Sequence, residues 1–251
     1  MLYSFTTSIS TSGNYDLVFT TTGQTDCYIN FTGTTQFQTL LLNKPPWARY
    51  SASNWSETTL TDLTTNARHA TTANLTTTTG SGNGATASIT YLTGTSTGSI
   101  RFPPGSLPTT YTVCSITSLT TSGGPLLQSG PSNPFLCGHW GNQRGIVYYN
   151  GVWITPEVSI GTPTDFVNVV TTNSESVAIP NNALIDGTGY ATSNSGSHTA
   201  NFLTINNGGW VTSTTPFRFS QLIIFDQGLT TEEMYIVSNA LKTYLTSGVL
   251  Q

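Results

Sequence analysis

Charged residues are scarce in this chain. They make up 7% of its 251 residues, whereas about a quarter is usual in soluble domains. The 7 basic residues stand singly along the sequence, against 11 acidic residues. Nucleic acids and anionic membranes are bound by clusters of lysine and arginine. The sequence therefore predicts neither a nucleic acid nor an anionic membrane as a partner.

Long apolar runs and cysteine are also rare. No run is long enough to span a bilayer, and the first residues, MLYSFTTSISTSGNYDLVF, lack a basic start and a continuous apolar core. We therefore predict no signal peptide, no transmembrane segment and no membrane insertion. Cys27, Cys114 and Cys137 stand at irregular spacing, which allows at most one disulfide and favours buried free thiols over a metal site.

What the chain has instead is threonine, serine, asparagine and glycine, with 11% aromatic and 36% apolar residues. This content favours β-sheet and supplies a core for one large domain. The clearest predicted strand is residues 109–120, TTYTVCSITSLT, in which core-facing and outward positions alternate. Further strands are predicted, at the intervals typical of a sandwich, in ATASITYLTG, GSIRFPPGSLP, PLLQSG, FLCGHW, GIVYYNGVWIT, DFVNVVTT, ESVAIPNN and ANFLTINN.

The residue pattern at the start of the chain differs from that of the rest. Residues 1–42 contain short alternating runs, the last of them FQTLLLN, which predict strands or an extended arm. Consecutive prolines in NKPPWARY then interrupt any sheet, and residues 48–84 are polar and loop-like. We predict an N-terminal extension over residues 1–42 and a domain over residues 43–251.

One helix is expected, close to the C-terminal end. Thr230 and Glu233 form a capping box, with Leu229 and Met234 placed as a hydrophobic staple. Gly248 is well placed to end the helix. The helix follows a predicted strand, FRFSQLIIFD, and must lie on an apolar surface because it carries one apolar stripe, Met234, Val237, Leu241, Tyr244 and Leu245.

These segments together resemble the laminin G-like, concanavalin A-like jelly-roll family, over roughly residues 45–245. The most specific mark is the closing FSQLIIFDQGLTTEEMYIVSNALKTYL, whose Asp226, Leu229, Thr230, Glu232 and Glu233 fit the family's turn into a terminal helix. The central GHWG resembles domains of this type in algae, other protists and their large DNA viruses. The resemblance implies an all-β fold, a two-sheet antiparallel sandwich with one short C-terminal helix, and leaves the function open.

The sequence contains no recognisable set of catalytic residues. A retaining glycosidase on such a sandwich needs two carboxylates about 5 Å apart, and relatives usually supply them as Glu-x-Asp-x-x-Glu, which is absent here. The adjacent Glu232 and Glu233 are explained by helix capping. His69, His139 and His198 lie in Thr- or Gly-rich surroundings, and no serine has the G-x-S-x-G context of a nucleophile. A structural role is favoured for Cys137 beside His139. We therefore predict no catalytic residues and a protein without enzymatic activity.

Calcium is a ligand that the resemblance implies for some relatives. Asp186, Asn182 and Asp165 would be the candidate ligands. Asp-Gly and Asn-Asn are also ordinary turn formers, and we favour that interpretation. No metal and no cofactor are therefore predicted.

The strongest candidate site is aromatic. The segment GHWGNQRGIVYYNGVW offers stacking rings beside hydrogen-bonding side chains, which together could form a shallow platform for sugars. Adjacent tyrosines point to opposite faces of a strand, so at most one of Tyr148 and Tyr149 joins such a surface. Core packing is the competing interpretation and is favoured over it. The predicted glycan-binding residues are His139, Trp140, Asn142, Arg144, Tyr149 and Trp153.

Low charge favours close-packed assembly, because few ions need to be desolvated at contacts, and an N-terminal arm suits strand addition to a neighbour. We predict a structural protein of a virion, a minor capsid or capsid-decorating component assembled in the host cytoplasm. It would pack against copies of itself or other structural proteins and contact host glycans. The alternative is a soluble carbohydrate-binding lectin module, and a glycoside hydrolase is the third hypothesis.

Overall fold

The computed structural model describes residues 35–121, 123–132, 134–149, 151–173, 182–190 and 201–250. The chain divides into two compact units, residues 1–33 and 34–251, and the described residues all belong to the second. Most of the predicted N-terminal extension, Cys27 and His198 lie outside the described residues. The predicted boundary after residue 42 therefore stays a prediction.

Strands dominate the described residues, with one helix at each end of this part of the chain. In chain order the elements are α1 (Gln36–Asn43), β1 (Ala48–Ser56), β2 (Thr59–Asp62), β3 (Ala70–Gly82), β4 (Ala85–Arg101), β5 (Thr112–Leu119), β6 (Leu127–Ser129), β7 (Phe135–Trp140), β8 (Gln143–Tyr149), β9 (Val152–Trp153), β10 (Val167–Thr172), β11 (Ala183–Ile185), β12 (Thr188–Tyr190), β13 (Leu203–Ile205), β14 (Phe217–Phe225) and α2 (Thr231–Ser247).

The described strands pair antiparallel in one hydrogen-bonded series, β12-β11-β10-β5-β14-β1-β2-β3-β4-β13-β6-β7-β8-β9. The first residues of β14 also pair with β4, so within this series β14, β1, β2, β3 and β4 form a closed ring of paired strands. β14 is central because its sequence, FRFSQLIIF, is apolar on both faces: every residue except Arg218 is buried.

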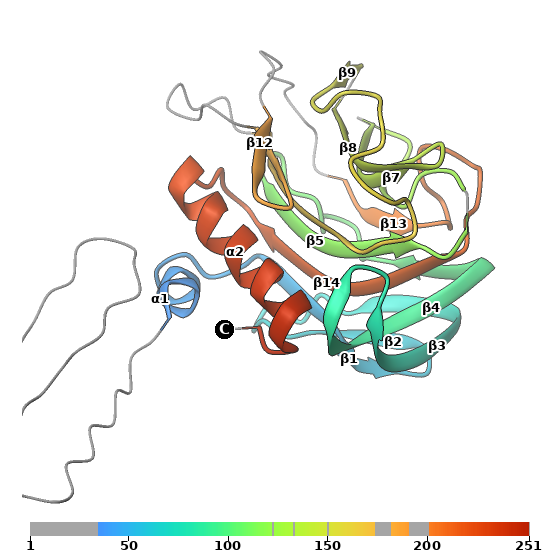
Figure 1. The fold of residues 1–251 in the computed structure, drawn as a ribbon, viewed down its shortest axis with the longest axis horizontal. Coiled ribbons are helices and arrows are strands. Elements are labelled where there is room, and N and C mark those ends of the chain that lie inside the picture. Colours follow the sequence, from blue (N-terminus) through green and yellow to red (C-terminus); the bar gives the residue numbers. More distant parts are fainter. Residues whose placement is uncertain are drawn as a thin grey trace, which may run out of the picture. The chain divides into compact units, whose positions relative to one another are not determined.

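Two apolar clusters lie on the opposite faces of the layer formed by β5, β10 and β14. Leu222 and Ile224 join the cluster shared with β7 and β8, whereas Ile223 and Phe225 join the cluster under α2. This division follows from the alternation of side chains along a strand. Figure 1 shows β5 and β14 between α2 on one side and β7 and β8 on the other.

The C-terminal helix has the predicted ends and the predicted face. Both hydrogen bonds of the Thr230–Glu233 capping box are present, and Gly248 ends the helix at φ +77° in the left-handed region. The whole predicted stripe, Met234, Val237, Leu241, Tyr244 and Leu245, is buried. The Glu233 carboxylate also accepts from Lys44, 2.7 Å away, which links the start of α2 to the end of α1.

Two local predictions are wrong. FQTLLLN is not a strand but helix α1, because Thr35 and Gln38 form a second capping box and Phe37 and Leu40 are buried on one side of a helical turn. Residues 48–84 are not loop-like, since they contain β1, β2 and β3. Strand β3 is mostly exposed and rich in threonine, so it lacks an apolar alternation, and pairing with β4 defines it instead.

The prediction of an all-β protein with a closing helix is confirmed, with α1 as an addition. The finer assignment to a jelly-roll sandwich stays a prediction. Among the described residues, no helix combines the length and the apolar character that crossing a membrane requires.

The cap of α2 gives a test of the fold. We expect Thr230→Ala to lower the free energy of unfolding by about 1 kcal/mol, because it removes the acceptor for the Glu233 backbone N–H. Thr243→Ala is the matched control: Thr243 is exposed in the middle of the same helix, where alanine is the better helix former. Urea unfolding of both variants measures the difference, and equal midpoints would contradict a role for the cap.

Candidate glycan-binding surface

Aromatic rings gather in one contiguous group beside β7, β8 and β9. Trp153 makes an edge contact with Tyr148, with centroids 4.8 Å apart, and a tilted contact with Trp140, with centroids 6.2 Å apart. Tyr148 also stacks on Trp210, with centroids 5.3 Å apart and planes 6° apart. All four rings are half-buried. We call Trp140, Tyr148, Trp153 and Trp210 the aromatic surface.

Hairpin register brings Tyr148 and Trp153 together. The chain turns back after β8 so that Tyr149 pairs with Val152 and Tyr148 pairs with Trp153. Paired residues on adjacent strands place their side chains on the same face, which explains the ring contact. Tyr149 points to the opposite face and is 1% exposed.

The backbone around Trp210 is fixed by strand β6. The N–H of Trp210 donates to the carbonyl oxygen of Ser129 at 2.9 Å. The Gln128 amide group brackets Val211, accepting from its N–H at 2.8 Å and donating to its carbonyl at 3.1 Å. A Cβ at Gly209 would collide with the Gln128 side chain, so only glycine fits there. The ring of Trp210 is therefore presented from a rigid loop.

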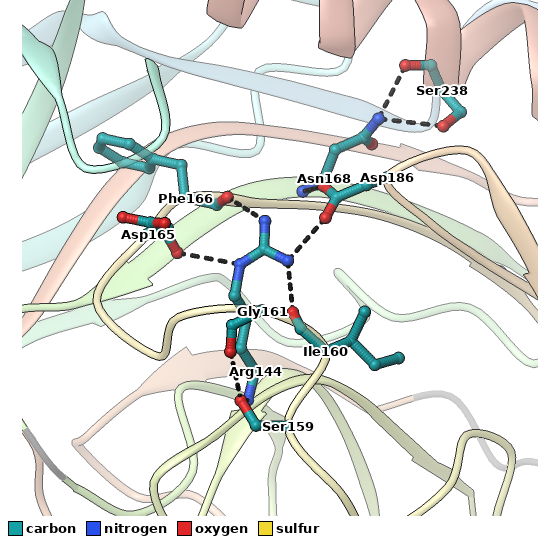
Figure 2. Close-up of polar contacts among 9 residues, drawn as sticks. All are labelled: Arg144, Ser159, Ile160, Gly161, Asp165, Phe166, Asn168, Asp186 and Ser238. Carbon is teal, nitrogen blue, oxygen red and sulfur yellow. Dashed lines mark hydrogen bonds and ion pairs between the residues drawn. The ribbon is translucent and has the colours of Figure 1, made fainter.

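A bulge in β8 sets the direction of Arg144. The β7–β8 register shifts between Gly138 and His139, where Gly138 pairs with Ile146 and His139 pairs with Arg144. Gly145 is left unpaired at φ +78°, a conformation that favours glycine. The simple alternation of faces along β8 breaks at this point, and Arg144 points toward β10 and the β11–β12 turn (Figure 2).

Arg144 is buried, and its guanidinium is bonded to oxygen atoms of the protein. Its guanidinium donates to the carbonyl oxygens of Ile160 at 2.7 Å, Asp165 at 3.3 Å and Phe166. It also pairs with the Asp186 carboxylate at 2.6 Å. Figure 2 shows these contacts converging on one side chain. These contacts use four of its five N–H donors, so Arg144 holds the segment before β10 in place.

Asp186 extends this network to the helix. Its second oxygen accepts from the backbone N–H of Asn168 at 3.0 Å, and the Asn168 amide donates to the Ser238 carbonyl of α2 at 2.7 Å. Asp186 and Gly187 occupy a two-residue turn, both at positive φ. The predicted turn role of Asp186 is confirmed. Within the described residues no group of three or more His, Cys, Asp or Glu side chains could hold a metal ion.

The six predicted glycan-binding residues thus separate into two groups. Trp140 and Trp153 belong to the aromatic surface, and Asn142 is exposed in the tight turn between β7 and β8. His139, Arg144 and Tyr149 are buried and cannot meet a sugar there. Tyr149 instead packs on Phe135, with centroids 5.4 Å apart.

Sequence reasoning considered Tyr148 and Tyr149 as alternatives and selected Tyr149, and it missed Trp210. The Asn-Gly pair at positions 150 and 151 was a usable signal for Tyr148, because a two-residue hairpin pairs the second residue before it with the second residue after it. No local signal marked Trp210, which lies more than fifty positions away in the sequence.

Cys137 and His139 do not form a reactive pair. Burial raises the pKa of the Cys137 thiol to about 12. Burial, and then the nearby Arg144 charge, lowers the pKa of His139 to about 3, although the Pro163 carbonyl offsets part of this effect. Both side chains are therefore neutral near pH 7. The prediction of buried free thiols is confirmed for Cys114 and Cys137.

Comparisons with known proteins give matches in structure only. No protein-family model matches the chain, and no curated protein matches its sequence. Trypanosoma rangeli sialidase in complex with sialic acid is similar in structure, with a TM-score of 0.55 and 14% identity over 80% of this chain and 33% of the sialidase. A structure described as a receptor binding domain has a TM-score of 0.51 and 10% identity, over 82% of this chain and 53% of that one.

A third similar structure is domain 4 of AbnA, a GH43 extracellular arabinanase from Geobacillus stearothermophilus, in complex with arabinotriose. Its TM-score is 0.49 and its identity 14%, over 76% of this chain and 97% of that domain. At such identities the likeness concerns the fold alone, and the chain spans about a third of the sialidase. These matches do not confirm the laminin G-like or concanavalin A-like family.

The predicted absence of enzymatic activity is contradicted. The solved structures that share this fold include an enzyme, Trypanosoma rangeli sialidase. The missing carboxylate triplet was therefore an insufficient reason to exclude catalysis, because it tested for one arrangement of acids only. The predicted role in a virion has no support among these structures.

The Arg144 network predicts a large loss of stability on mutation. Arg144→Met leaves the Asp186 carboxylate and three carbonyl oxygens without their donor, and we expect a loss of about 3–5 kcal/mol in the free energy of unfolding. Arg101→Met is the control, since Arg101 is exposed and stacks on Phe202. Chemical denaturation measures both. A loss of less than about 1 kcal/mol for Arg144→Met would contradict this structural role.

His139 predicts acid sensitivity. Its pKa is about 3 in the folded protein, below the ordinary value of 6.5, so the unfolded chain binds a proton more readily. Its contribution to stability is fully present above pH 6.5 and is lost as the pH falls toward 3, by up to about 1.4 kcal/mol per pH unit. His139→Gln should flatten this part of the curve of urea midpoint against pH. An unchanged slope would show that the histidine is not buried in its neutral form.

Proposed function

We propose that this protein binds carbohydrate through the aromatic surface. The observation that carries the proposal is the contiguous group of half-buried rings formed by Tyr148, Trp153, Trp140 and Trp210. Aromatic rings in a core are fully buried, as Tyr149 and Phe135 are. Rings that stay half-exposed while packing on one another instead offer an apolar surface for a ligand.

The chemistry of this surface suits sugars. The faces of sugar rings that carry C–H groups stack on aromatic rings, while hydroxyl groups need hydrogen-bonding partners at the rim. Asn142 supplies an exposed amide in the turn that follows Trp140. No charged side chain belongs to the aromatic surface, which favours neutral parts of a glycan.

The similar structures support the same class of function. One is a sialidase described in complex with sialic acid, and another is described as a receptor binding domain. Among the functions considered from the sequence, carbohydrate binding fits these neighbours better than a structural role in a virion. The support is for the class of ligand, and the aromatic surface is our proposal for the site.

Glycan binding is tested first by array screening of the purified protein and then by calorimetric titration of the glycan with the highest affinity. Trp153→Ala should weaken binding about tenfold or more, as truncation of a central aromatic anchor usually does. Tyr148→Ala should have a similar effect, because its ring contacts both Trp153 and Trp210.

Trp55→Ala is the matched control. Trp55 is also half-buried, but it lies on β1, where its indole N–H donates to Thr72. We expect this variant to bind as the unmodified protein does. If Trp55→Ala and Trp153→Ala lose affinity equally, or if neither does, the aromatic surface is not the site.

A further inference from the structure

Arg49 lies between two cavities on a different part of the molecule. One has a volume of about 320 Å³ and the other about 700 Å³, and Arg49 and Leu63 line both. The smaller cavity is bordered by β1, β14 and the end of α2, through residues that include Ser51, Gln221 and Tyr244. Neither cavity is lined by a residue of the aromatic surface.

The guanidinium of Arg49 has no polar partner in the described part of the protein. Its Nε is buried and makes no hydrogen bond, and neither of the two ion pairs found there involves Arg49. Its guanidinium carbon lies over the ring of Phe37, 5.9 Å from the ring centroid. Burial lowers the pKa of Arg49. The Nε–H donor of this half-buried arginine is withdrawn from water and left without an acceptor, which is costly.

The nearby acids do not neutralise this charge. The buried carboxylate of Asp62 accepts the backbone N–H groups of Arg49, Thr64 and Arg68, and the Thr64 hydroxyl. Asp62 thereby fixes the loop after β2, and both of its carboxylate oxygens are engaged in these hydrogen bonds. Asp226 lines the larger cavity but is exposed and does not pair with Arg49. This contrasts with Arg144, which meets a carboxylate and three carbonyl oxygens.

The rest of the smaller cavity carries hydroxyl and amide groups. Ser51 and Ser53 share a hydrogen bond of 2.7 Å, and the Gln221 amide donates to Ser51 at 3.0 Å. Gln221 is 3% exposed, and its side-chain oxygen is buried without a hydrogen-bond partner. Asn54, Ser88 and Thr90 complete the polar wall. Such a wall provides partners for a ligand with several hydroxyl groups.

We infer that the smaller cavity binds an acidic sugar, with the sugar's carboxylate paired to Arg49 and its hydroxyl groups bonded to Ser53, Asn54 and Gln221. A carboxylate matches the planar fork of a guanidinium. A single arginine balances one negative charge, which fits a carboxylate better than a doubly charged phosphate. The volume of about 320 Å³ is at the small end of ligand sites and suits one sugar unit.

This inference goes beyond the proposed function and does not depend on the aromatic surface. The two sites share no residue, and different ligand chemistry is assigned to each. Hexuronic acids and sialic acids both carry the required carboxylate on a polyhydroxylated body. Titration with hexuronic acids and with a sialic acid distinguishes these two sources.

The test is a calorimetric titration of the full chain with D-glucuronate, D-galacturonate and N-acetylneuraminate, with D-glucose and inorganic phosphate as comparison ligands. We expect at least one of the three acids to bind, with D-glucose and phosphate about tenfold weaker or more. Arg49→Met should weaken the acid about tenfold or more, and Arg49→Lys should recover part of the loss, because lysine keeps the charge without the fork.

Two controls keep the outcome specific. Arg101→Met removes an arginine that also stacks on an aromatic ring, and Trp153→Ala removes the centre of the aromatic surface. Both should bind the acid normally, so failure of the proposed function leaves this result unaffected. Without ligand, Arg49→Met should unfold at the same urea concentration as the unmodified protein or a higher one, since it removes a half-buried charge that has no ion-pair partner and a buried Nε–H without an acceptor.

The inference is overturned if none of the three acids binds, if D-glucose or phosphate binds as tightly as the acids, or if Arg49→Met binds like the unmodified protein. It is also overturned if Arg101→Met or Trp153→Ala loses the acid as Arg49→Met does. Should Arg49→Met fail to fold, the Arg49→Lys titration decides: unchanged affinity would argue against a bidentate pair, and a loss of about tenfold would support it.

Discussion

Burial of β14 on both faces is the constraint on which the rest of the structure depends. Along β14, Leu222 and Ile224 belong to one apolar cluster, whereas Ile223 and Phe225 belong to the other. Each face of the strand therefore needs another element to cover it and exclude water. Helix α2 supplies one, and the layer of β7 and β8 supplies the other. The capping box at Thr230 and the network from Arg144 to Ser238 hold these coverings in position.

The aromatic surface is a consequence of this arrangement. Because the inner faces of β7 and β8 are used to cover the central layer, Phe135 and Tyr149 are buried there. The residues that alternate with them face outwards, and Tyr148 is among these. Trp153 and Trp210 then meet Tyr148 from a short hairpin and from a loop fixed by Gln128. The core thus decides which aromatic rings remain available to a ligand.

The scarcity of charge makes the buried Arg144 and the half-buried Arg49 informative. Arg144 satisfies its guanidinium with protein oxygens and acts as a structural link between layers. Arg49 is half-buried and lacks such partners, with its Nε buried and unpaired beside serines and a glutamine. A hydroxyl-rich protein with 7 basic residues and a net charge of −4 has few ways to attract an anion, so an unpaired guanidinium in a polar cavity stands out. The same residue type therefore serves stability at one position and is assigned to recognition at the other.

The sequence by itself determined the all-β class, the buried thiols and the ends and buried face of α2, because capping and amphipathic periodicity are local signals. It did not determine β3, whose exposed threonines depend on pairing with β4, or the short helix α1. The sequence pointed to Trp140 and Trp153, but the tertiary structure decided which other residues join the candidate sites. The bulge at Gly145 turned Arg144 away from the surface, and Trp210 reached Tyr148 from a distant loop. Such long-range contacts follow from packing of the whole chain, and no local pattern encodes them.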